Sequence, residues 1–78
     1  MTDRIKLIWD FRGPEAKHFA EHHAKHLREY VIAEGLENTN CDIEILNPMR
    51  AIAFMEGERE KMNAIKPILK PQFEAPVK

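Results

Sequence analysis

The pattern of hydrophobic residues predicts an α+β protein of ferredoxin-like type, in which two helices cover one face of an antiparallel sheet. Three observations support this: a period-two alternation over residues 4–12, a 3.6-residue period over residues 14–34, and an alternating hairpin followed by a short helix. The order is strand, helix, strand, strand, helix, and then a tail or a last strand. Because crossover connections are right-handed, both helices are expected on the same face.

The first strand and the first helix have clear boundaries. Over residues 4–12 Ile5, Leu7, Trp9 and Phe11 fall on one side of a strand, so that side lies on a core, although Trp9 or Phe11 could face the helices or the open side. Ile8 falls on the other side. Pro14 suits the first position of a helix, and Gly35 suits its C-terminal end. These signals predict a helix over residues 14–34.

One stripe of this helix is apolar and is expected to cover the sheet. Small alanines let helix and sheet approach closely, with Phe19 and Leu27 filling the gaps between them. The members of the stripe are Ala16, Phe19, Ala20, His23, Ala24, Leu27, Tyr30 and Val31.

The second half of the chain begins with a hairpin. Residues 41–45 alternate between apolar and acidic side chains, and Asn47-Pro48 marks a turn. The apolar run 51–55 then forms the second strand, with Ile52 and Phe54 on one face. This run is too apolar for a strand that faces solvent, so we expect a central strand that is covered on both faces.

A ferredoxin-like sheet leaves one face without helices. If this open face carried the other side chains of the hairpin, it would present an exposed apolar patch, and such patches mark partner surfaces. A homodimer joined sheet to sheet is therefore expected. The predicted patch consists of Ile8, Ala51, Ala53 and Met55.

The C-terminal part contains a short helix and several prolines. Gly57 ends the strand, residues 58–66 are predicted to be helical, and Pro67 stops the helix. Residues 1–70 are thus expected to form a single domain. Residues 71–78 are either a tail or a short edge strand.

Composition excludes several classes of protein. The chain has 78 residues with 12 basic and 13 acidic side chains, which leaves a formal charge of −1. A nucleic-acid-binding surface normally needs a basic stripe, and no apolar run approaches the roughly 20 residues of a membrane span. Cys41 is the only cysteine, so an internal disulfide is excluded. A cytoplasmic protein without nucleic-acid or membrane partners is expected.

All four histidines lie within nine residues of the first helix. His18, His22 and His26 form one row on its polar side, and Glu15 and Glu29 extend this row at both ends. The simplest interpretation is a solvated helix face. The alternative is a weak site for zinc or nickel, because two imidazoles at i and i+4 can chelate one ion, with a further ligand from elsewhere or from a second copy.

The fourth histidine, His23, points into the apolar stripe. It is either a packed core residue or a functional group in a cleft. In the second case Asp10 is its candidate partner in a catalytic acid–base pair, with Tyr30, Arg12 and Trp9 as ligand-binding residues.

The segment Glu21-His22-His23-Ala24-Lys25-His26-Leu27, together with Glu34-Gly35-Leu36, resembles the helix of small YciI-like proteins of the dimeric α/β-barrel superfamily. The resemblance implies a ferredoxin-like protomer that dimerises through its sheet and holds a small-molecule cleft. His23, or His22, would match the helical histidine of that family. The family's partnering aspartate has no direct match, since Asp10 lies earlier in the chain and Glu15 is a different residue.

These observations predict a homodimeric module that binds a ligand or a partner. Two alternatives stay open. One is a small enzyme that uses the His23–Asp10 pair, and the other is a divalent-metal binder that uses the histidine row.

Overall fold

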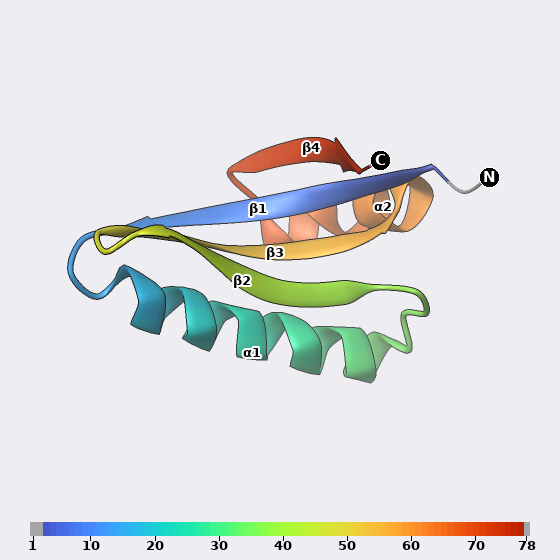
Figure 1. Cartoon of the computed structure of the whole chain (residues 1–78). Coiled ribbons are helices and arrows are strands. Elements are labelled where there is room, and N and C mark those ends of the chain that lie inside the picture. The colour runs from blue at the N-terminus through green and yellow to red at the C-terminus, as the bar shows by residue number, and fades with distance from the viewer. Residues whose placement is uncertain (1–2, 78) are drawn as a thin grey trace.

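The computed structural model describes residues 3–77, which form one four-stranded sheet and two helices (Figure 1). The strand order is β2-β3-β1-β4, and all neighbouring strands are antiparallel. This confirms the α+β class, and the topology is consistent with the ferredoxin-like arrangement. Met1, Thr2 and Lys78, at the outer ends of the predicted segments 1–70 and 71–78, lie outside the described residues. The elements are β1 (Arg4–Arg12), α1 (Ala16–Glu34), β2 (Asn40–Asn47), β3 (Arg50–Glu58), α2 (Arg59–Leu69) and β4 (Phe73–Val77).

Both helices pack on the same face of the sheet, as predicted. Along β1, Ile5, Leu7 and Trp9 are buried, whereas the residues between them are only partly covered. These three side chains share one hydrophobic cluster with residues of β3, α1 and α2. Figure 1 views the sheet from its other side, with α2 behind β1 and β3. Trp9, for which the sequence left both faces open, therefore faces the helices.

Helix α1 begins at Ala16 rather than at Pro14 and ends at Glu34 as predicted. Gly35 has a φ of +63°, and its N–H donates a hydrogen bond to the carbonyl of Ile32 at 3.2 Å. Glycine adopts this left-handed conformation without a steric penalty, which explains why the helix ends here.

The buried stripe of α1 consists almost entirely of alanine. Phe19 is 52% exposed, so the prediction that its ring fills a gap above the sheet is wrong. Ala16 and Ala20 pack directly against Ala51 of β3, and this close approach leaves no space for a ring between helix and sheet. The buried members of the stripe are Ala16, Ala20, Ala24 and Leu27.

Strand β3 presents the opposite face from the one expected. Ala51, Ala53 and Met55 are buried beneath the helices, so their predicted place in an open patch is wrong, whereas Ile8 does lie on the face without helices. Ile52 and Phe54 lie on the face without helices, and β3 is covered by helices on one face only. The physical reason is the close approach of α1, because small side chains in the strand meet small side chains in the helix.

Gly57 lies inside β3 and does not end it. A Cβ atom at this position would lie 2.8 Å from Cε of Met62 and 3.2 Å from Oγ1 of Thr39. Met62 is fully buried in the core cluster. The glycine therefore leaves room for the Met62 side chain where α2 packs on the strand, and a larger residue here would force that side chain to shift.

Helix α2 continues past Pro67 to Leu69, so the predicted end at Lys66 is wrong. A proline inside a helix lacks one hydrogen bond and costs about 3 kcal/mol. The hydrophobic stripe of α2 nevertheless continues from Ile65 to Leu69, which packs against the core. In addition, the indole Nε1–H of Trp9 donates a hydrogen bond to the carbonyl of Leu69 at 3.2 Å, and this contact anchors the last turn.

Residues 73–77 form an edge strand, which decides between the two predicted alternatives for the C-terminal segment. β4 pairs with β1, and Phe73 lies opposite Ile8. Pro76 is tolerated because an edge strand does not need every backbone N–H for pairing. The C-terminal segment is therefore part of the sheet, and Phe73 is 56% exposed on the face without helices.

Candidate functional site

The residues predicted to form a catalytic or ligand site are divided between the two faces of the sheet. His23 and Trp9 lie on the helix side. Asp10 and Arg12 lie on the open side, because successive residues of a strand point to opposite faces. The predicted His23–Asp10 pair therefore does not form within one protomer. Tyr30 is partly buried and packs against the core cluster instead of joining Arg12.

His23 is half-buried and packs against two aromatic rings. Its imidazole centre lies 4.9 Å from the ring centre of Trp9 and 5.6 Å from that of Phe11. The Nε2 atom is buried and has no hydrogen-bond partner among the described residues. Burial, and secondarily the nearby His26 and His22, lowers the pKa of His23 below its ordinary value. The side chain is therefore a neutral packing group at neutral pH.

We expect the unfolding free energy to fall as the pH drops below about 6.5, the ordinary pKa of histidine. In this range His23 binds a proton in the unfolded chain but stays neutral in the folded chain, because its pKa is lowered in the folded state. Protonation therefore favours unfolding. His23→Phe keeps the ring packing and removes the titration. Urea unfolding from pH 8 to pH 5, with a chelator present, should show the stability difference shifting in favour of the variant as the pH falls. A difference independent of pH would contradict this placement of His23.

Asp10 has a structural role. Its carboxylate accepts hydrogen bonds from Nε of Arg50 and Nε of Arg12, both at 3.0 Å, and its side chain is only 8% exposed. The hydrogen bond from Arg50, followed by that from Arg12, holds the pKa of the Asp10 carboxyl below its ordinary value, against the opposing effect of burial. Because two guanidinium groups bind the carboxylate and its lowered pKa makes it a weak base, Asp10 joins β1 to β3 and is poorly suited to acid–base chemistry.

The histidine row brings only two of its three members together. Nε2 of His22 and Nε2 of His26 are 3.1 Å apart, and Nδ1 of His26 lies 3.3 Å from Oε1 of Glu29. His18 instead makes an edge contact with the ring of Phe19. Across residues 3–77 no group of three or more histidine, cysteine or acidic side chains is arranged to hold a metal ion.

Cys41 is a partly buried thiol on the edge strand β2. Burial raises its pKa to about 11, against the opposing effect of Arg28. The thiol is therefore protonated at neutral pH and is a poor nucleophile.

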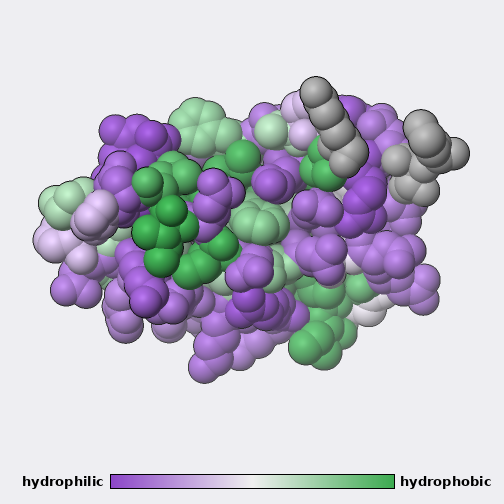
Figure 2. All heavy atoms as spheres, in the orientation of Figure 1, coloured by the Kyte–Doolittle hydropathy of each residue, from purple (hydrophilic) through white to green (hydrophobic). Residues whose placement is uncertain are grey.

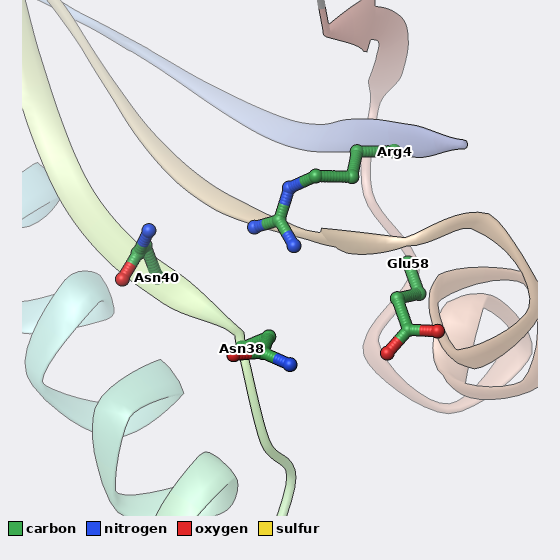
Figure 3. Close-up of a pocket in the computed structure, with 4 residues that line it drawn as sticks. All are labelled: Arg4, Asn38, Asn40 and Glu58. Atoms are coloured by element: carbon green, nitrogen blue, oxygen red, sulfur yellow. The ribbon is translucent and has the colours of Figure 1, made fainter. Parts of the chain in front are cut away.

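Sequence reasoning did not single out a polar depression at one end of the sheet (Figure 3). It has a volume of about 320 Å³ and is lined by Arg4, Asn38, Asn40 and Glu58. Figure 3 shows the Arg4 guanidinium directed into it from β1. The same guanidinium contacts the carboxylate of Glu56 at 3.5 Å, so its charge is already balanced. The polar connection at residues 36–40 was the sequence signal for this feature.

Among the described residues, the face of the sheet without helices carries a group of large apolar side chains that we call the open-face cluster, namely Ile8, Ile52, Phe54 and Phe73. Ile8 lies at its centre, opposite Phe54 in one neighbouring strand and opposite Phe73 in the other. The Lys6 ammonium lies 4.4 Å above the ring centre of Phe54. Figure 2 shows hydrophobic atoms gathered over the sheet on this side, bordered by hydrophilic residues. Alternation indicated two faces for β3 but did not show which one the helices cover.

Neither helix within residues 3–77 combines the length and the apolar composition needed to cross a bilayer. Comparison of the chain with known protein families, with curated proteins and with solved structures gives no match.

Proposed function

We propose that the protein is an interaction module that works as a homodimer, in which two copies pack their open sheet faces against each other. The open-face cluster is the observation that carries this proposal. Its side chains are apolar, partly or mostly accessible, and placed together on a layer that no helix covers. Apolar clusters with a polar border are typical of protein–protein interaction surfaces.

Charge on the same face favours a second copy as the partner. In a two-fold symmetric dimer one surface patch packs against itself, so a patch with a single sign of charge would repel its copy. The border of the open-face cluster carries both signs, with Asp42 and Glu44 on β2 and Lys6 and Arg12 on β1. The Arg12 side chain is 71% exposed and can reach an acidic side chain of a second copy.

The size of the face also suits a dimer. β1 and β3 each have 9 residues. At about 3.3 Å per residue and 4.8 Å between strands, the sheet spans roughly 30 Å by 19 Å. Because side chains protrude from the sheet, the accessible surface of this face is larger than its flat area. It approaches the roughly 800 Å² that each partner of a stable complex buries. The resemblance of residues 21–27 to YciI-like proteins implies the same association through the sheet.

We expect sedimentation equilibrium at tens of micromolar to give the mass of a dimer, and Phe54→Glu to give a monomer. The new carboxylate lies beside Lys6, which can neutralise it in the single chain. In the dimer it would replace an apolar contact, so the dissociation constant should rise about 30-fold or more, as for an interface hot spot.

Ile32→Glu is the matched control, because Ile32 is 79% exposed on α1 and lies away from the open face. Circular dichroism of both variants checks that the fold is intact. A wild-type protein that stays monomeric at tens of micromolar would overturn the proposal. A dimer that resists Phe54→Glu but is lost in Ile32→Glu would place the interface on the helix layer instead.

A further inference from the structure

We infer that His22 and His26 form a two-ligand site for a divalent transition metal of the class that prefers imidazole, namely Cu²⁺, Ni²⁺ or Zn²⁺. The site lies on the exposed side of α1, in the helix layer, so the inference is independent of the proposed dimer through the sheet.

The distance between the two ring nitrogens fits one shared ion. Nε2 of His22 and Nε2 of His26 are 3.1 Å apart, and the two rings meet edge to face with their centres 4.5 Å apart. With metal–nitrogen bonds of about 2.05 Å, this spacing corresponds to an angle of about 98° at the metal. That angle lies between the octahedral and the tetrahedral values, so an ion can bind both nitrogens without a change of backbone.

Glu29 prepares one of the two ligands. Its Oε1 lies 3.3 Å from Nδ1 of His26, a contact that favours the tautomer with the proton on Nδ1 and the lone pair of Nε2 free. A carboxylate on the outer ring nitrogen is the usual support for a metal-binding histidine, because it fixes the tautomer and makes the ligand more basic. With His26 in this tautomer, the short contact between the two Nε2 atoms in the metal-free protein is a hydrogen bond that His22 donates through its Nε2–H. Metal binding replaces this hydrogen bond, and the proton of His22 moves to its Nδ1.

The helix holds the pair rigidly and leaves it accessible. Both histidines lie in the interior of a 19-residue helix, far from its ends. Both are exposed, so water molecules can complete the coordination. Because the described residues offer no third ligand of the histidine, cysteine or acidic type, the expected order of affinity follows the intrinsic series, with Cu²⁺ tighter than Ni²⁺ or Zn²⁺.

Calorimetric titration of the protein, without a polyhistidine tag, with CuCl₂, NiCl₂ and ZnCl₂ tests this inference. We expect one ion per chain in the wild type. In His22→Ala and in His26→Ala the affinity should be at least about tenfold lower, because each variant loses the chelating pair. Glu29→Gln should bind more weakly than the wild type while keeping both ligands. Electron paramagnetic resonance of the Cu²⁺ complex should report two nitrogen ligands from the protein.

His18→Ala is the matched control, since His18 belongs to the same helix row but lies outside the pair. Its affinity should equal that of the wild type. An unchanged affinity in His22→Ala would overturn the inference. A loss in His18→Ala as large as in His22→Ala would also overturn it, because it would show that all three histidines contribute.

Discussion

Trp9→Ala is expected to destabilise the protein by about 3–5 kcal/mol, the range for removing a large aromatic side chain from a core. Trp9 is only 6% exposed and contacts both helices. It packs against the ring of His23 in α1 and donates a hydrogen bond to the carbonyl of Leu69 in α2. A domain of 78 residues has a total stability of roughly 4–12 kcal/mol. The variant should therefore be marginally folded, with a thermal midpoint lower by more than about 12 °C.

Trp9→Phe separates the two contributions of this side chain. It keeps an aromatic ring in the core but removes the Nε1–H that Leu69 accepts at 3.2 Å. Leaving one partly buried carbonyl without a partner costs about 1–3 kcal/mol. Thermal unfolding followed by far-ultraviolet circular dichroism measures both variants. If Trp9→Ala lost less than about 1 kcal/mol, its role at the junction of both helices would be contradicted.

The fold was predictable because its signals are local. The alternation in residues 4–12 and the glycine after residue 34 each depend on only a few neighbouring residues, and both match the structure. The end of α2 was not predictable from Pro67 alone. The contacts that extend this helix, Leu69 with the core and with Trp9, join residues that lie far apart in the sequence.

The candidate sites depend more strongly on long-range geometry. Spacing alone predicts that His18, His22 and His26 form one row. Only the side-chain geometry shows that the Nε2 atoms of His22 and His26 lie close together while His18 contacts Phe19. Similarly, the sequence allows Asp10 to pair with His23 because it does not show which face of β1 carries Asp10. The structure places the two side chains on opposite faces of the sheet. The alanines at positions 51 and 53 were a usable signal, since they match the small residues of the first helix.

Introducing a lysine at either of two adjacent positions in β3 tests which face of this strand the helices cover. Ala53 is fully buried under α1, so Ala53→Lys places a long charged side chain where none fits. Overpacking costs about 1–3 kcal/mol, and an unpaired buried charge costs several more. Together these approach the whole stability of a domain of this size, and we expect a protein that is largely unfolded.

Ile52→Lys should instead fold, because Ile52 lies on the open face with Asp10 and Glu44 as its cross-strand neighbours. The new ammonium group gains two acidic neighbours, and the loss of a half-covered apolar side chain should cost about 1 kcal/mol. Circular dichroism and urea unfolding of both variants, at the same low concentration, measure the contrast. Since the two positions are neighbours in one strand, a difference of several kcal/mol exceeds the effect of the different starting residues and reports which face each side chain occupies. The reverse result, with Ala53→Lys folded and Ile52→Lys unfolded, would place the helices on the other face of the sheet.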